Sequence, residues 1–257
     1  MGMWKLIDKP PHVTPIGNKF IFAKKCDNEG NILKYKARLV AKGCTQRPGY
    51  DFINTHLPVV RLDSIHTILA ITPTWKLHIH QLDMKGTYLN STLKEKVYMK
   101  QPEGYGDGTP HICLLVKTLY GLKQAGREWN LEFNRKLRKR GYSRLRSDPC
   151  VYIFHTDDDF VIITVWVDDM LLFAMTVELK QKAIADVESK WEITDMGMPT
   201  KIIGIELKIS PDEISISSSS YIKSILEKEL LERCNPVSTP LDPNVPLEPN
   251  PEGNEGD

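Results

Sequence analysis

The sequence predicts an α+β fold in which antiparallel hairpins and amphipathic helices follow one another along the chain. Apolar segments bounded by turn residues predict paired strands at 19–41, 160–174 and 201–217. Apolar residues at helical spacing predict helices at 62–72, 122–142 and 177–191. With 257 residues, of which 41% are hydrophobic and 26% charged, the chain can bury a core as one large domain or two small ones.

The first half of the chain predicts a hairpin, a helix and a strand in that order. Residues 4–14 are interrupted by prolines and predict a loop or an edge strand. Residues 19–24 and 33–41 predict the two arms of a hairpin around 27–30. The helix at 62–72 ends at Pro73, and a strand at 76–83 follows it and ends on Asp83.

The second half alternates helices with further hairpins. A Gly- and Pro-rich loop at 101–110 precedes the long helix at 122–142, in which Trp129, Phe133 and Leu137 share one face. Further strands and helices are predicted at 151–154, 160–167, 177–191, 201–209, 213–217 and 221–231. The acidic triplet within 156–159 predicts a solvated turn, and the acidic, Pro-rich residues 243–257 predict a disordered tail.

Composition and charge exclude several classes of protein. Five scattered cysteines indicate a reducing compartment and no zinc site, and no apolar run is long enough to cross a membrane. The net charge of +1 gives no general argument for nucleic-acid binding, yet residues 135–146 hold seven basic side chains and no acid. That run predicts either a solvated helix face or a contact with a phosphate backbone. His78 and His80 share a strand face without a nearby cysteine, which favours ordinary strand residues.

Three aspartates are the candidate metal ligands. Asp168 and Asp169 follow Trp166 and Val167 between two nearly continuous apolar runs, which predicts strand, tight turn, strand. Carboxylates held at such a turn suit hard cations such as Mg²⁺, although aspartate pairs at turns are also common structural residues. Asp83 ends another apolar strand and precedes a small-residue turn, whose amides could face a phosphate. Taken alone, Asp83 fits a helix N-cap or a turn acid better than a metal ligand.

Several motifs in a fixed order carry a family resemblance. They are Tyr35-Lys-Ala-Arg-Leu-Val-Ala-Lys-Gly43, Leu57-Pro-Val-Val-Arg-Leu62, Asp83-Met-Lys-Gly-Thr-Tyr-Leu-Asn90, Val97-Tyr-Met-Lys-Gln-Pro-Glu-Gly-Tyr105, Thr118-Leu-Tyr-Gly-Leu-Lys-Gln-Ala125, Val167-Asp-Asp169 and Pro236-Val-Ser-Thr-Pro-Leu-Asp242. Together they resemble the reverse transcriptase domain of copia-type LTR retrotransposons. The resemblance covers nearly the whole chain, from about residue 4 to 242.

This resemblance implies the fingers and palm of a polymerase right hand over residues 1–242, with an antiparallel palm sheet and a partial thumb. It implies an RNA-directed DNA polymerase that extends a primer on an RNA or DNA template with deoxynucleoside triphosphates. It also implies a larger polyprotein, an intracellular setting in a cytoplasmic particle, and no membrane partner. Asp83, Asp168 and Asp169 would hold two Mg²⁺ or Mn²⁺ ions.

The resemblance further implies a set of nucleotide-pocket residues. Tyr88 would pack under the sugar and exclude a 2′-hydroxyl, or else be a core tyrosine, and Thr87 would present its amide to the triphosphate. The remaining predicted pocket residues are Lys36, Arg38, Lys42, Gly121, Lys123 and Gln124. Strand alternation is expected to put Lys36, Arg38 and Lys42 on one face, where they meet the triphosphate or remain solvated.

The chain departs from the family pattern beside these positions. It has Gly86-Thr-Tyr88 where the family usually has Thr-Ala-Phe, and Ala125-Gly-Arg-Glu-Trp129 where the family usually has Ala-Pro-Arg-Ala-Trp. No departure touches a candidate metal ligand. Two alternatives therefore stand beside the polymerase: a catalytically decayed, nucleic-acid-binding remnant and, third, a metal-dependent nuclease that uses the same carboxylates.

Overall fold

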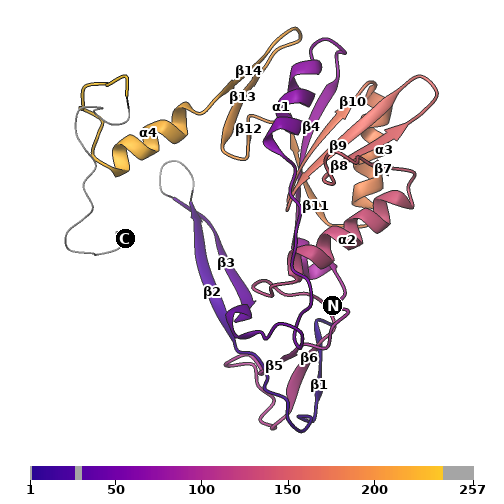
Figure 1. Cartoon of the computed structure of the whole chain (residues 1–257), viewed down its shortest axis with the longest axis vertical. Helices are drawn as coiled ribbons and strands as arrows, with labels where there is room; N and C mark the ends of the chain where they lie inside the picture. The colour runs from indigo at the N-terminus through magenta and orange to yellow at the C-terminus, as the bar shows by residue number, and fades with distance from the viewer. Residues whose placement is uncertain (1, 27–30, 240–257) are drawn as a thin grey trace. The chain divides into compact units, whose positions relative to one another are not determined.

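The computed structural model describes residues 2–26 and 31–239 and has a mixed α and β architecture with antiparallel sheets (Figure 1). Four α-helices lie within those residues. Contacts divide the chain into two units, residues 1–216 and 217–257, which are described separately. The predicted tail at 243–257 lies outside the described residues. The α+β class predicted from the sequence is thus confirmed.

A six-stranded sheet forms the centre of the first unit, in the order β11-β4-β10-β9-β8-β7. Every neighbouring pair in it is antiparallel. Its strands are β4 (His78–Met84), β7 (Ser143–Arg144), β8 (Val151–His155), β9 (Phe160–Trp166), β10 (Asp169–Ala174) and β11 (Ile193–Gly197). β11 was not predicted, because most of its residues are exposed and its sequence has no apolar run; it extends the sheet by pairing with β4.

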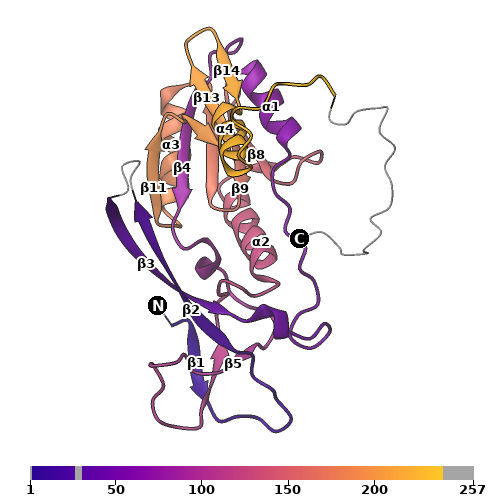
Figure 2. The same cartoon turned by 90° about the vertical axis from the view of Figure 1, so that its left-hand side faces the viewer.

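Both faces of this sheet are covered, which explains the continuous apolar runs of its central strands. On one face, Met170 and Leu172 pack with side chains of α2 (Ala125–Arg138) and α3 (Val177–Glu188). On the other, Leu171 and Phe173 pack with α1 (Leu62–Ile71) and with apolar residues of 202–214 (Figure 2). Successive strand residues point to opposite faces, so a strand buried on both sides is apolar at every position.

The N-terminal part of the first unit contains a long hairpin and a small sheet. β2 (Asn18–Cys26) pairs with β3 (Ile32–Ala41) as predicted. β1 (Trp4–Ile7) is the edge strand of a sheet with β6 (Ile112–Leu115) and β5 (Tyr98–Met99). Buried residues of this sheet pack with Ala41 and Leu122, so the base of the hairpin joins a third apolar core.

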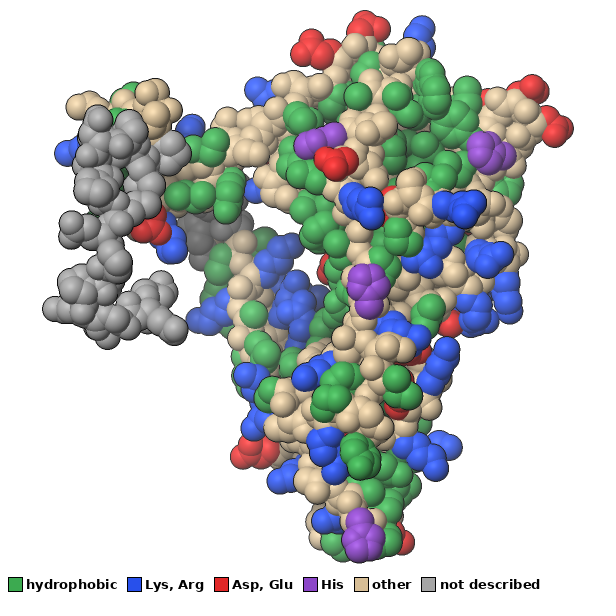
Figure 3. All heavy atoms as spheres, viewed as in Figure 1, with side chains coloured by type: hydrophobic (Ala, Val, Ile, Leu, Met, Phe, Trp, Pro, Cys, Tyr) green, Lys and Arg blue, Asp and Glu red, His purple; other side chains and the backbone are tan. Residues whose placement is uncertain are grey.

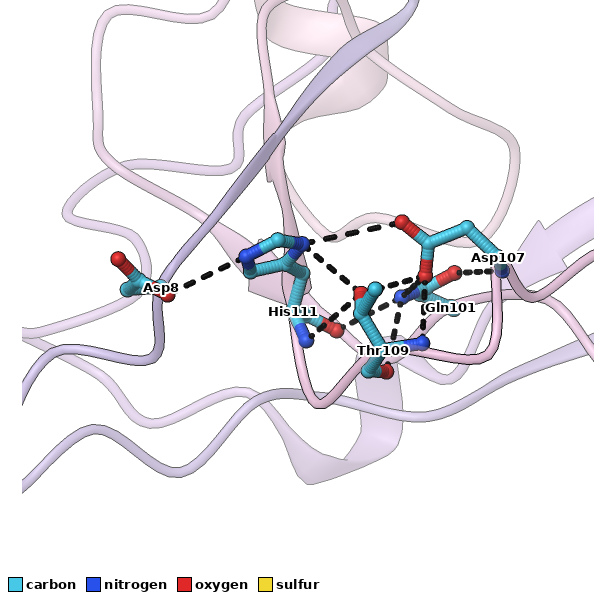
Figure 4. A network of polar contacts seen from close by, with 5 residues as sticks. All are labelled: Asp8, Gln101, Asp107, Thr109 and His111. Atoms are coloured by element: carbon cyan, nitrogen blue, oxygen red, sulfur yellow. Dashed lines mark hydrogen bonds and ion pairs between the residues drawn. The ribbon is translucent and has the colours of Figure 1, made fainter.

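The Gly- and Pro-rich loop predicted at 101–110 is organised by one carboxylate (Figure 4). Asp107 accepts hydrogen bonds from the side chain of Gln101 at 2.8 Å and from the backbone N–H of Thr109 at 3.0 Å. His111 lies between Asp107 and Asp8, with N···O distances of 3.7 and 3.2 Å. Hydrogen bonds to the charged form hold the pKa of Asp107 well below its usual range. The loop therefore returns the chain to β6 with its polar groups paired.

Two predicted elements differ from the structure. The strand predicted at 201–209 is wrong as a single element: β12 (Lys201–Ile202) turns back on β13 (Ile205–Ile209). The turn contains Ile203 at φ 50° and Gly204 at φ 82°, and β14 (Ile214–Ser217) completes this three-stranded sheet. The helix predicted at 122–142 is shorter in the structure, as α2: residues 123 and 124 form a turn before it, and the chain leaves it through Gly141, which has a positive φ.

The second unit contains α4 (Ser219–Lys228), close to the helix predicted at 221–231. None of the side chains of α4 is buried. Among the residues that the structure describes, no helix combines the length and the apolar character needed to cross a membrane. The predicted partial thumb, which would begin in this region, stays a prediction.

Candidate functional site

Asp83 and Asp169 lie directly opposite each other on neighbouring strands. The antiparallel register of β4 and β10 pairs the two residues. Directly opposed residues project from the same face of a sheet. The residues two positions away on the same face, such as Leu171, belong to the core under α1, so both carboxylates lie on the α1 face. Two acids with 85 residues of sequence between them thereby lie side by side at one end of β4 and β10.

Asp168 lies in the two-residue turn that joins β9 to β10. Asp169 is paired with Trp166, which leaves Val167 and Asp168 as the turn. The backbone carbonyl of Asp168 accepts a hydrogen bond from the N–H of Met84 at 2.9 Å. This bond fixes the turn to the end of β4, one residue after Asp83. The backbone therefore brings the three predicted acids together.

The electrostatics of these acids reflect their proximity. Burial raises the pKa of Asp83, and the neighbouring charge of Asp168 raises it further. Burial also raises the pKa of Asp169, with added repulsion from Asp168 and Asp83, while a hydrogen bond from the Gln81 side chain opposes this rise. Like charges in a partly desolvated place disfavour ionisation. A bound cation would relieve that repulsion.

The donor atoms of this site suit a hard cation. All three acids offer carboxylate oxygens, which Mg²⁺ binds together with phosphate oxygens of a substrate. Within residues 2–26 and 31–239, no group of three or more His, Cys, Asp or Glu side chains is already arranged as a set of metal ligands. The imidazole of His80 pairs with the carboxylate of Asp195 at 2.6 Å. The acids thus form an open, all-oxygen donor set rather than a closed cage.

The long hairpin brings positive charge to the acids. Lys36 on β3 and Lys25 on β2 both lower the pKa of Asp83, as does Lys85. In the β2–β3 register, Lys36 lies opposite Ala23 and Lys25 opposite Lys34, so strand alternation puts these lysines on one face. Figure 3 shows Lys and Arg side chains gathered on this hairpin. The basic face of the hairpin therefore stabilises the ionised carboxylate of Asp83 on the central sheet.

Tyr88 and Thr87 lie in a 3-10 turn, η2 (Thr87–Asn90), which follows Gly86 at φ 60°. The ring of Tyr88 is half-buried and packs edge-on against Tyr120, with 5.2 Å between centroids. Burial raises the pKa of Tyr88, and the charge of Asp168 adds to this effect, so the phenol lies beside the acids. Thr87 is buried, and its hydroxyl donates to the carbonyl of Met84 at 3.2 Å.

Arg38 and Lys42 have different surroundings. Arg38 lies on the same face of β3 as Lys36, and its guanidinium lies 5.7 Å from the Tyr120 ring centroid and hydrogen-bonds to that tyrosine. Lys42 lies one residue beyond the end of β3, and its aliphatic carbons pass over Gly17. Strand alternation puts Lys36 and Arg38 on one face of β3. Lys42 lies just outside the strand, and its place on the same face stays a prediction.

The segment after Tyr120 is mainly a scaffold. Gly121 has φ 87°, and a Cβ there would lie 2.2 Å from the carbonyl oxygen of Ala41. The Gln124 side chain is fully buried, accepts from Gln46 at 2.9 Å and donates to the carbonyl of Asp51 at 2.9 Å. It has no exposed surface with which to contact a nucleotide, which corrects its predicted place in the pocket lining. Lys123 is exposed, with its ammonium 5.1 Å from the Phe52 ring centroid.

The basic run at 135–146 is partly occupied by contacts within the chain. Arg135 and Lys136 pair with Glu132, at 2.7 and 3.3 Å, and Arg140 pairs with Asp186 at 2.9 Å. Lys and Arg side chains gather over α2 in Figure 3, but α2 covers the face of the sheet opposite the carboxylates. This arrangement favours a structural and solvated role over a contact with nucleic acid at the site.

Sequence reasoning missed or undervalued three neighbours of the acids. Gln81 hydrogen-bonds Asp169, and its place two residues before Asp83 on the same strand could have indicated a shared face. Tyr120 contacts both Arg38 and Tyr88, and nothing in the local pattern indicates this. The charge of Lys25 lowers the pKa of Asp83, which the sequence cannot indicate because it depends on how the hairpin folds towards the central sheet.

Comparison with known proteins agrees with the family resemblance of the sequence motifs. The model of the family "Reverse transcriptase (RNA-dependent DNA polymerase)" matches residues 1–243. The Retrovirus-related Pol polyprotein from transposon TNT 1-94 of Nicotiana tabacum is 37% identical over 93% of this chain and 18% of its own length. The polyprotein from transposon RE1 of Arabidopsis thaliana is 35% identical over 95% of this chain and 17% of its own. The Transposon Ty1-DR1 Gag-Pol polyprotein of Saccharomyces cerevisiae is 30% identical over 89% and 12%. The chain thus spans less than a fifth of the length of these relatives.

Proposed function

Because the chain belongs to the reverse transcriptase (RNA-dependent DNA polymerase) family, we propose that it extends a primer on an RNA or DNA template as the polymerase part of a copia-type Pol polyprotein. The observation that carries this proposal is the Asp83–Asp169 pair in the β4–β10 register, with Asp168 in the adjoining turn. Three carboxylates at the ends of neighbouring strands, beside basic side chains, form an arrangement that suits metal-assisted phosphoryl transfer.

In the proposed mechanism the chain's own residues supply position and charge. Asp83, Asp168 and Asp169 would hold two Mg²⁺ or Mn²⁺ ions. When bound, such ions lower the pKa of the primer 3′-hydroxyl and neutralise the triphosphate. Lys36 and Arg38 project from the face of the hairpin that acts on Asp83, and there they would contact the triphosphate.

The substrates that fit this site are a primer–template and deoxynucleoside triphosphates. Tyr88 would discriminate against a ribose 2′-hydroxyl, because its half-buried ring lies beside Asp168 and is braced by Tyr120. The hydroxyl of Thr87 holds the turn by its bond to Met84, and the backbone amide of Thr87 would meet a phosphate oxygen of the triphosphate. Lys123 is the exposed charge of the neighbouring segment and would meet the template strand or the triphosphate.

The test is primer extension on poly(rA)/oligo(dT) with Mg²⁺ or Mn²⁺, with wild type compared to the double variant Asp168→Asn, Asp169→Asn. We expect extension by the wild type and its loss in the variant, since asparagine keeps the shape but removes the charge. The matched control is Asp157→Asn, Asp158→Asn, which removes the same charge from an exposed turn. The control should extend primers at the wild-type rate.

Three results would overturn the proposal. Extension at the wild-type rate by the Asp168→Asn, Asp169→Asn variant would make these acids structural. Binding of a primer–template by the wild type without any extension, with both metals, would identify a decayed remnant instead. Cleavage of the template without extension would indicate a nuclease.

A further inference from the structure

The turn that carries Asp168 has an unfavourable backbone conformation. Val167 occupies the first position of this two-residue turn and has φ 57°. Two-residue hairpins require positive φ at that position because such turns match the twist of the strands, and glycine is the residue that usually fills it. A β-branched residue in the left-handed region is strained. The turn therefore needs a contact elsewhere in the fold to hold it.

Such a contact comes from α2, on the face of the sheet opposite the carboxylates. The indole Nε1 of Trp129 donates a hydrogen bond to the carbonyl oxygen of Val167 at 3.2 Å. Trp129 is 1% exposed, and its ring packs against Phe133 and Trp191 with centroid distances of 5.3 and 5.6 Å. A ring held this tightly presents its N–H in one direction.

Both carbonyl groups of the turn are thus fixed, and from different elements. Trp129 bonds the carbonyl of Val167, while the N–H of Met84 bonds the carbonyl of Asp168 at 2.9 Å. Relief of the strain at Val167 would rotate the peptide between Val167 and Asp168, and this rotation would turn the Val167 carbonyl away from the indole. The same rotation would move the Asp168 side chain relative to Asp83.

We propose that Trp129 is a positioning residue: its indole N–H holds the strained Val167 peptide in place, and this fixes the direction of Asp168 and Asp169. The proposal rests on the proposed polymerase function for its effect on rate, but not for its effect on the turn. Trp129 is buried on the face of the sheet opposite the carboxylates and acts only through the backbone of the turn.

The chain offers a matched pair of variants. Trp129→Phe keeps an aromatic ring in the core and removes the N–H donor. Trp191→Phe makes the same chemical change in the same cluster, where Trp191 is 4% exposed and its Nε1, among the described residues, has no hydrogen-bond partner. Any difference between the two variants therefore reports the bond to Val167 rather than loss of indole packing.

The first measurement is hydrogen–deuterium exchange, which needs no catalytic activity. Trp129→Phe should speed exchange of amides in a peptide covering residues 165–171, roughly threefold to tenfold for the loss of one buried hydrogen bond. Trp191→Phe should leave that peptide at the wild-type rate. Equal exchange at 165–171 in both variants would overturn the proposal, whatever the activity of the chain.

The second measurement is steady-state primer extension. Trp129→Phe should lower kcat by about tenfold while the KM for primer–template stays unchanged, since the acids are misdirected but the binding surface is intact. Val167→Gly in the Trp129→Phe background should restore part of kcat, because glycine adopts positive φ without strain. If the wild type does not extend primers, the proposed function fails, and the exchange measurement still decides the role of Trp129. If the wild type extends and the two tryptophan variants lose activity equally, the positioning role is refuted.

Discussion

Replacement of Gly121 by alanine should destabilise the junction between the hairpin and the segment that carries Lys123. Gly121 has φ 87°, and a Cβ there would lie 2.2 Å from the carbonyl oxygen of Ala41 and 2.6 Å from Cγ1 of Val40. The N–H of Ala41 also donates to the carbonyl of Tyr120 at 2.8 Å. An added methyl group must therefore push the end of β3 away and stretch this bond.

The magnitude follows from two separable costs. An alanine in the left-handed region costs about 1–2 kcal/mol. A methyl group forced against backbone in a packed place costs roughly a further 1–3 kcal/mol. Gly121→Ala should therefore lower the free energy of unfolding by about 2–5 kcal/mol, a large part of the roughly 5–15 kcal/mol typical of a domain.

Two control variants separate these costs. Gly49 has φ 78°, and a Cβ added there would have no atom within 4 Å, so Gly49→Ala has the conformational cost alone. Gly43 has no positive φ, but its Cβ would lie 2.0 Å from the carbonyl oxygen of Gly121, so Gly43→Ala has the steric cost alone. Urea unfolding, followed by tryptophan fluorescence, gives the free energy of unfolding of each variant. If Gly121→Ala and Gly49→Ala are equally destabilised, the close approach to Ala41 is refuted.

Three further predictions concern the acids and their neighbours. Burial and nearby acids raise the pKa of Asp169 in the folded protein, so the folded state loses stability as pH rises from the unfolded-state pKa of Asp169 through its folded-state pKa. In thermal scans at pH 7, Asp169→Asn should therefore have a higher Tm than wild type. This difference in Tm should close towards pH 4 and narrow with added Mg²⁺. A Tm gap independent of pH would contradict the repulsion. Tyr88→Ala should raise ribonucleotide incorporation relative to deoxynucleotide incorporation in extension assays, and an unchanged ratio would assign Tyr88 to the core. Lys36→Ala should raise the KM for deoxynucleotides severalfold, because the Lys36 charge acts on Asp83. The control is Lys34→Ala, two residues earlier on the same strand, which should raise this KM less. Equal effects of the two variants would indicate that Lys36 is a solvated lysine.

The sequence predicted the central hairpin well because burial on both faces has a local signature. The apolar runs on either side of Asp168 required strands covered on two sides, and α1 on one face with α2 and α3 on the other supply that cover. The turn at Ile203 and Gly204 was not predicted, because a strand pattern with one glycine does not distinguish a bulge from a reversal. The weakly apolar strand β11 was not predicted either, since its place depends on pairing with β4.

By itself, the sequence determined which residue types were available: oxygen donors at Asp83, Asp168 and Asp169, and positive charge along β3. Only the tertiary structure decided which of them meet. The strand register pairs Asp83 with Asp169. The fold of the hairpin places the charge of Lys36 where it lowers the pKa of Asp83. Burial makes Gln124 a scaffold residue. The physical reason is that periodicity fixes the face on which a side chain lies, whereas contacts between distant segments depend on how the layers pack around a shared core.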